Sequence, residues 1–129
     1  MVTRPRILVV DDQDALRRLY QLVLTYLGYD NEATGDSREA LALLESGRFD
    51  LVICDLDMRH FDGAGLVRSL RAAGSRVPVL IVSAALPLGG ILPGDIRDEV
   101  AVVLPKPTGA EELLAGIKRA LNWKSSKPE

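Results

Sequence analysis

The stretch LVICD, residues 51–55, passes through four apolar side chains without a break and ends on the carboxylate of Asp55. Residues 7–10 form a similar apolar run, which is followed by the adjacent carboxylates of Asp11 and Asp12. Short runs of this kind are typical of strands buried on both faces, and such strands belong to parallel sheets. Ligands bind a parallel sheet at the carboxyl ends of its strands, so we expect three carboxylates to meet at that edge.

The rest of the chain alternates between strand-like and helix-like segments. We expect strands at residues 7–11, 29–33, 51–55, 77–83 and 100–104, and helices at residues 14–27, 36–44, 64–73 and 108–123. The strand at residues 29–33 is weak and polar, which favours a place near the sheet edge. Asp36 with Glu39, and Thr108 with Glu111, have the spacing of helix capping boxes. Five strands that alternate with helices predict an α/β domain with a doubly wound parallel sheet, right-handed crossovers and helices on both faces.

One connection departs from this alternation. Residues 86–94, between the fourth and fifth strands, contain two prolines and three glycines, and both residue types oppose the interior of a helix. We therefore expect the fourth helix to be short or disrupted, with at most a turn around residues 95–99. The connection is either a surface loop or a specialised partner surface. The domain is expected to span residues 1–123, with residues 124–129 as a polar tail or the start of a linker.

The composition of the chain excludes several classes of function. The chain has 129 residues, of which 47% are hydrophobic and 26% charged, and this is typical of one globular domain with a single core. A net charge of −2 argues against direct binding of nucleic acid, and no apolar run has the length of a membrane span or resembles a secretory signal. The single cysteine, Cys54, excludes an internal disulfide and gives no zinc-like spacing. We therefore expect a cytoplasmic protein that does not bind membranes, with no DNA-binding or catalytic domain after residue 123.

Two further side chains are expected at the same edge, because Ser83 ends the fourth strand and Lys106 follows the fifth. Three carboxylates repel one another unless a cation joins them, which implies a hard divalent metal such as Mg²⁺. The set matches the requirements of phosphoryl transfer to a carboxylate. Asp55 would be the nucleophile, with Asp12 and Asp11 holding the metal. Lys106 would pair with the phosphoryl oxygens, and the Ser83 hydroxyl would donate a hydrogen bond to one of them.

Taken together, these residues resemble the receiver domain of two-component response regulators, over nearly the whole chain. The matching features are Asp11-Asp12, residues 55–58 with Asp62-Gly63 beyond them, Ser83-Ala84 and Lys106-Pro107. The resemblance implies a flavodoxin-like sheet with strand order 2-1-3-4-5, as in chemotaxis regulators that consist of a single receiver.

The resemblance also implies a mechanism and partners. Asp55 would accept a phosphoryl group from a phosphohistidine on a sensor histidine kinase or a histidine phosphotransfer protein. The backbone carbonyl of Asp57 would join Asp12 and Asp55 around Mg²⁺, while Ser83 and Lys106 would follow the phosphoryl group. The protein would phosphorylate and dephosphorylate itself without turning over an external substrate. It would act as a monomer or weak homodimer on a downstream target that the sequence does not disclose.

Some positions depart from the pattern of similar domains. Val103 stands where Tyr or Phe usually occurs three residues before the lysine, and Thr108 stands where Phe often follows the Lys-Pro pair. The loop at residues 86–94 replaces a regular fourth helix. These differences concern the output face, so we expect the phosphorylation chemistry to be kept and the output route to be unusual.

Alternatives stay open at this stage. A pseudo-receiver, a folded interaction module that no longer uses phosphate, would also lack the aromatic residue at position 103. A haloacid-dehalogenase-type phosphatase would use the spacing of Asp55 and Asp57, although those enzymes carry this motif on their first strand. Asp11 and Asp12 have a second possible role as caps of the first helix. Trp123 either covers the rim of the core or faces a partner.

Overall fold

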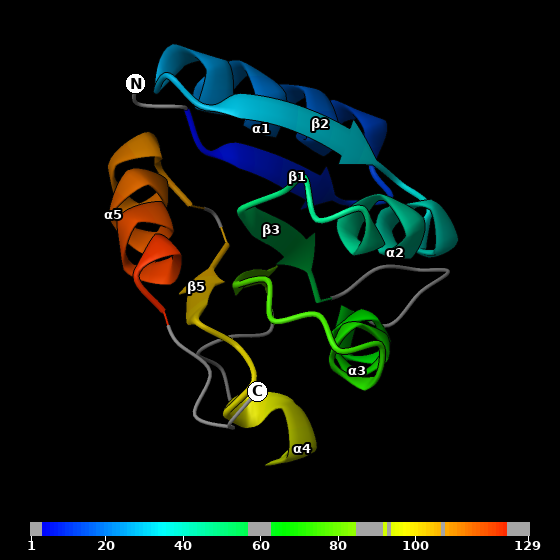
Figure 1. Cartoon of the computed structure of the whole chain (residues 1–129). Helices are drawn as coiled ribbons and strands as arrows, with labels where there is room; N and C mark the ends of the chain where they lie inside the picture. The colour runs from blue at the N-terminus through cyan, green and yellow to red at the C-terminus, as the bar shows by residue number, and fades with distance from the viewer. Residues whose placement is uncertain (1–3, 57–62, 85–91, 93, 107, 124–129) are drawn as a thin grey trace.

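The computed structural model describes residues 4–56, 63–84, 92, 94–106 and 108–123. Within these residues the strands are β1 (Arg6–Val10), β2 (Asp30–Thr34), β3 (Leu51–Asp55), β4 (Val79–Ser83) and β5 (Val102–Pro105). The helices are α1 (Asp14–Tyr26), α2 (Ser37–Glu45), α3 (Gly63–Ala72), α4 (Gly94–Arg97) and α5 (Ala110–Leu121). All neighbouring strands are parallel, in the order β2-β1-β3-β4-β5 (Figure 1). The predicted fold and strand order are confirmed, and the polar β2 lies at one edge.

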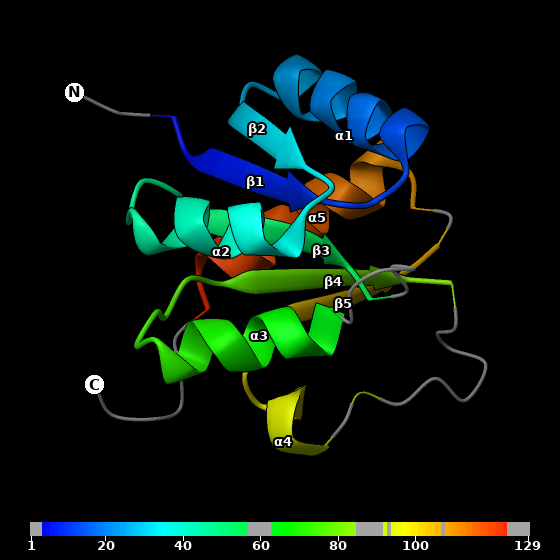
Figure 2. The same ribbon diagram turned by 90° about the vertical axis from the view of Figure 1, so that its right-hand side faces the viewer.

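Helices cover both faces of the sheet. Successive side chains of a strand point to opposite faces, so β1 and β3 each contribute to two apolar clusters. Leu8 and Val52 pack with residues of α2 and α3, whereas Val9 and Ile53 pack with residues of α1 and α5. Figure 2 shows the same division, with α2 and α3 on one face and α1 and α5 on the other. The strands are therefore held between two apolar layers, which leaves their carboxyl ends to carry the polar side chains.

Helix boundaries follow local chemistry, and one predicted cap is wrong. Asp36 is the N-cap of α2, where its carboxylate accepts hydrogen bonds from the backbone N–H groups of Arg38 and Glu39 at 2.8 and 3.4 Å. Thr108 is not the N-cap of α5, because the helix is capped by Gly109. The Thr108 hydroxyl instead donates to the Pro105 carbonyl at 2.7 Å, and this bond closes the end of β5.

The fourth helix is short, as predicted. α4 has four residues and is held against α3 by the buried side chain of Ile96 and by an ion pair between Arg68 and Asp95. Residues 86–91 and 93 of the Pro/Gly-rich stretch lie outside the described residues. In the part of the chain that the structure describes, no helix has the length and apolar character needed to span a membrane.

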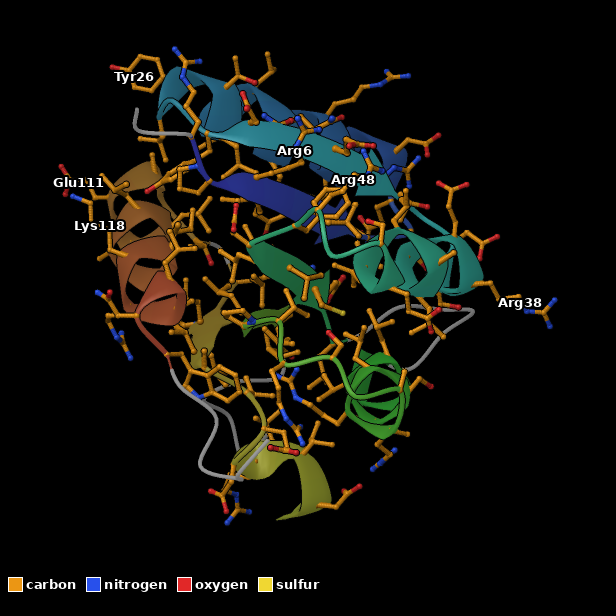
Figure 3. The ribbon with its side chains drawn as sticks, viewed as in Figure 1. Arg6, Tyr26, Arg38, Arg48, Glu111 and Lys118 are labelled. Atoms are coloured by element: carbon orange, nitrogen blue, oxygen red, sulfur yellow. The ribbon has the colours of Figure 1, made fainter. Side chains whose placement is uncertain are left out.

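Most charged side chains lie on the outer surfaces of the helices and at the sheet edge. Figure 3 shows Tyr26, Arg38 and Lys118 projecting outward from α1, α2 and α5. Arg6 and Arg48 both approach Glu32 of β2, with N–O distances of 3.1 and 3.9 Å. Exposed pairs of this kind contribute little to stability. The edge strand is thus lined with charge, which disfavours pairing with another strand.

Candidate functional site

The centre of the site is a buried ion pair between Asp55 and Lys106. The Lys106 ammonium donates to Asp55 Oδ2 at 2.8 Å, and the two side chains are 18% and 2% exposed. Asp55 is the last residue of β3, and Lys106 follows β5. Its backbone N–H donates to the carbonyl of Ser83 at 3.0 Å, so main-chain pairing with β4 places the lysine. Both residues are expected at this edge of the sheet, and the structure brings them into direct contact there.

Asp11 lies beside this pair and carries an unsatisfied oxygen. Asp11 and Asp55 line the same small recess, at the face of the sheet that is covered by α1. Asp11 Oδ1 accepts a hydrogen bond from the Gln13 backbone N–H at 2.9 Å. Oδ2 is buried and has no hydrogen-bond partner among the described residues. A buried carboxylate oxygen without a hydrogen-bond partner lowers the stability of the fold unless a donor or a cation binds it.

Negative charge accumulates at this edge. Burial raises the pKa of Asp11 above its ordinary value, and the charges of Asp55 and Asp12 raise it further. The Gln13 hydrogen bond and the Lys106 charge act in the opposite direction. The ionised form of Asp11 is therefore less favourable here than in water, and a cation would relieve the repulsion.

The other two predicted residues also lie at this edge. Asp12 is partly exposed and follows Asp11 in the connection to α1. The N-cap of α1 is Gln13, which makes no side-chain capping bond, so the alternative in which Asp11 or Asp12 is the cap residue is wrong. Ser83 is completely buried at the end of β4.

Gly63 holds the first turn of α3 against the end of β3. A Cβ atom at this position would lie 2.8 Å from the Asp55 carbonyl oxygen and 3.0 Å from the Leu56 Cα. Both neighbours are backbone atoms, so a larger residue would have to displace the strand end that carries Asp55. The sequence shows Gly63 only as part of the family resemblance, because this close approach depends on how α3 packs.

Tyr20, on α1, is a neighbour of the site that is not among the site residues expected from the sequence. It lines the recess of Asp11 and Asp55, and it also lines a cavity of about 480 Å³ beside Lys106. Burial, followed by the charges of Asp11 and Asp55, raises the pKa of Tyr20 to about 12. The phenol is therefore neutral at physiological pH. In the sequence, the helical spacing of Tyr20 from Leu16 and Val23 predicts that its side chain is turned toward the sheet. The spacing does not predict that Tyr20 lies near the carboxylates.

The described residues fit a magnesium ion in part. The unsatisfied Asp11 oxygen and the mutual repulsion of the carboxylates both favour a hard cation with oxygen ligands. No group of three His, Cys, Asp or Glu side chains among the described residues is arranged to hold a metal. Asp57, which the resemblance assigns as a ligand through its carbonyl, lies outside those residues.

The fold and these side chains define a receiver domain of two-component signalling. A family model for the response regulator receiver domain matches residues 7–118, and the chain belongs to this family. The response regulator MprA of Mycolicibacterium vanbaalenii is 39% identical over 116 residues, which cover 90% of this chain and 50% of the relative. MprA of Mycobacterium avium is 36% identical over 124 residues, which cover 96% of this chain and 53% of the relative.

Solved structures agree with this family. A sensor protein from Polaromonas is 28% identical with a TM-score of 0.83, and the match covers 93% of this chain and 98% of that one. The chemotaxis response regulator CheY4 of Vibrio cholerae is 28% identical with a TM-score of 0.75, covering 92% of this chain and 99% of that one. The signal receiver domain of an HD domain-containing protein from Pseudomonas fluorescens is 30% identical with a TM-score of 0.80, covering 94% and 90%.

The chain spans about half the length of the curated relatives it matches. The expectation that the protein has no direct contact with nucleic acid is therefore not supported, because it rests on the charge of this segment alone. The domain limits at residues 123 and 124 likewise stay a prediction. The match to a receiver family rather than a phosphatase family disfavours the haloacid-dehalogenase alternative.

Proposed function

We propose that Asp55 accepts a phosphoryl group from a phosphohistidine on a sensor histidine kinase or a histidine phosphotransfer protein. The observation that carries this proposal is the contact between the buried Asp55 carboxylate and the Lys106 ammonium, 2.8 Å apart at the carboxyl edge of the sheet. A carboxylate that is fixed by a cation and placed at this edge is oriented for attack on phosphorus.

The transfer follows from the chemistry of these groups. A carboxylate oxygen of Asp55 forms a bond to phosphorus while the bond from phosphorus to the histidine nitrogen breaks, and the imidazole keeps the bonding electrons and takes up a proton. Lys106 neutralises charge on the phosphoryl oxygens and remains paired with the acyl phosphate. The Ser83 hydroxyl donates a hydrogen bond to one of these oxygens. The modified residue carries more negative charge than the carboxylate did, and this difference drives the switch.

Mg²⁺ is the proposed cofactor, held by Asp12 and Asp55 with Asp11 and the carbonyl of Asp57. When bound it would supply positive charge against the equatorial phosphoryl oxygens. Among the described residues, several carboxylates meet at the site and Lys106 is the lysine that opposes their charge. This leaves net negative charge where the phosphoryl group must bind, so phosphorylation without a divalent ion is expected to be slow.

Two assays separate the proposed function from the pseudo-receiver and phosphatase alternatives: intact mass after phosphorylation, and turnover of p-nitrophenyl phosphate. The protein is incubated with phosphoramidate or acetyl phosphate, with Mg²⁺ or with EDTA, and its intact mass is measured beside that of Asp55→Asn. We expect one phosphoryl group per chain in the wild type with Mg²⁺ and none in Asp55→Asn. A wild type that gains no phosphoryl group would support a pseudo-receiver. Continuous release of p-nitrophenol from p-nitrophenyl phosphate would support a phosphatase.

A further inference from the structure

Arg71, at the end of α3, joins three segments that are distant in the sequence. Its guanidinium donates to the Ser75 and Val77 carbonyls at 3.1 and 2.8 Å and to the Glu99 carbonyl at 2.7 Å. Its Cζ also lies 5.1 Å from the centre of the Trp123 ring. One side chain therefore contacts the connection before β4, the turn after α4 and Trp123, which lies two residues after the end of α5.

The surroundings of Arg71 are buried and charged. The Glu99 side chain is only 5% exposed, and its carboxylate lies 3.9 Å from the Arg76 guanidinium. Burial lowers the pKa of Arg71, an effect that Glu99 opposes and Arg76 reinforces. Arginine keeps its proton in proteins, so the guanidinium remains a cation with a fixed fork of donors. Lysine has the charge but neither the fork nor the flat face that stacks on an indole.

α3 connects this cluster to the site as a rigid element. Its first residue, Gly63, is packed against the backbone of Asp55, and Arg71 lies in its last turn. A helix of ten residues is about 15 Å long and resists bending within a packed layer. Figure 2 shows α3 running along the sheet from the carboxyl ends of the strands toward the opposite edge. A displacement at Asp55 therefore has a direct path to Arg71.

The turn after α4 is the second element at Arg71. Glu99 lies between α4 and β5, the strand that Lys106 follows. The Ala101 backbone N–H donates to the Val79 carbonyl at 2.9 Å, which ties this turn to the start of β4. Movement of Ser83 or Lys106 at the carboxyl ends of β4 and β5 thus also acts on the segment that Arg71 holds.

We propose that Arg71 couples phosphorylation at Asp55 to the end of α5, by moving the turn at Glu99 and Trp123 together. This inference rests on the proposed phosphorylation of Asp55. It gives Trp123 a role that its position in the sequence left open, since the indole lies against the cation that links α3 to the turn after α4. The chain beyond residue 123 would receive the signal through this contact.

The test uses Trp123 as a reporter, because it is the single tryptophan of the chain. Its fluorescence emission is recorded for the full chain with Mg²⁺, before and after phosphoramidate, while intact mass gives the phosphorylated fraction of the same sample. We expect the emission to change on phosphorylation in the wild type. In Arg71→Lys, phosphorylation should proceed and the change should be lost. Arg68→Lys is the matched control, since Arg68 lies on α3 and pairs with Asp95, and its emission change should equal that of the wild type.

The possible results separate the coupling through Arg71 from the proposed phosphorylation of Asp55. Phosphorylated wild type with unchanged emission, or an equal change in Arg71→Lys, overturns the coupling while the proposed function stands. A wild type that gains no phosphoryl group by mass removes the proposed function and the coupling with it. If Arg71→Lys does not fold by circular dichroism, amide exchange of the wild type decides instead. Altered exchange at residues 99–101 and 121–123 on phosphorylation supports the coupling, and altered exchange at only one of them refutes it.

Discussion

Replacing Lys106 with methionine tests the electrostatic centre of the site. Methionine keeps most of the apolar length of the lysine side chain but removes its charge, which leaves the Asp55 carboxylate buried beside Asp11 and Asp12. At 2.8 Å, the attraction between Asp55 and Lys106 is about 6 kcal/mol for an effective dielectric constant of about 20. Part of this is offset by the cost of removing both charges from water.

The expected loss of stability is smaller than the Coulomb energy. Removing one partner of a buried ion pair costs about 3–5 kcal/mol, because the remaining charge stays buried. Since Lys106 is 18% exposed and water reaches part of the pair, we expect the lower end, about 3 kcal/mol. Adding Asp55→Asn to Lys106→Met should recover most of the loss, since the isolated carboxylate is then gone.

The measurement is urea unfolding of the wild type, both single variants and the double variant, all in EDTA so that no divalent ion replaces the lysine charge. Lys118→Met is the control, because Lys118 is an exposed residue of α5, and its free energy of unfolding should stay within about 0.5 kcal/mol of the wild type. If Lys106→Met were as stable as the wild type, or if the double variant were less stable than Lys106→Met, the ion pair would not have the role assigned to it.

Three further substitutions give independent predictions. Asp11→Asn should raise the melting temperature in EDTA at neutral pH, and titration calorimetry should show weaker Mg²⁺ binding. The pKa of Asp11 is raised in the folded state, so ionisation of Asp11 lowers the stability of the protein as the pH rises from below the unfolded-state pKa through the folded-state pKa. A stability gain that is confined to acid pH would contradict this. Gly63→Ala should cost about 1–3 kcal/mol in urea unfolding and slow phosphorylation by phosphoramidate, because its Cβ meets the Asp55 backbone, while Gly94→Ala, with open space at its Cβ, should phosphorylate at the wild-type rate. Asp36→Ala should cost about 1 kcal/mol in unfolding, through loss of the α2 cap, with unchanged phosphorylation; an equal stability would show that the cap is not needed.

The fold could be predicted from the sequence because β1, β3 and β4 are short apolar runs that end on, or are followed by, polar residues. β3 begins and ends at the predicted residues, and the site residues Asp55 and Lys106 meet because parallel strands place their carboxyl ends at one edge. The expected strand at residues 77–83 begins only at Val79. The Val77 carbonyl accepts from the Arg71 guanidinium instead of from β3, and Pro78 has no backbone N–H to donate, although its carbonyl accepts from Val52 of β3.

The remaining features depend on packing that a local pattern does not contain. The spacing of Thr108 and Glu111 is that of a capping box, yet the Thr108 hydroxyl is bonded to Pro105 and the helix starts one residue later. Arg71 is one of many arginines in the sequence, and its contacts with Glu99 and Trp123 join residues more than twenty positions away. Val103, the position that lacks an aromatic ring, is partly buried against the apolar cluster under α2 and α3. This packing does not test how phosphorylation reaches the output face, and the unusual output route stays a prediction.

Mapping the phosphorylated residue tests the central claim most directly. The wild type is phosphorylated with Mg²⁺ and phosphoramidate, the acyl phosphate is reduced with borohydride, and the reduced residue is located by tandem mass spectrometry of peptides covering Asp11, Asp12, Asp55 and Asp57. We predict reduction at Asp55 alone, and none in Asp55→Asn. Reduction at another of these aspartates in the wild type would contradict the assignment of Asp55 as the phosphoacceptor.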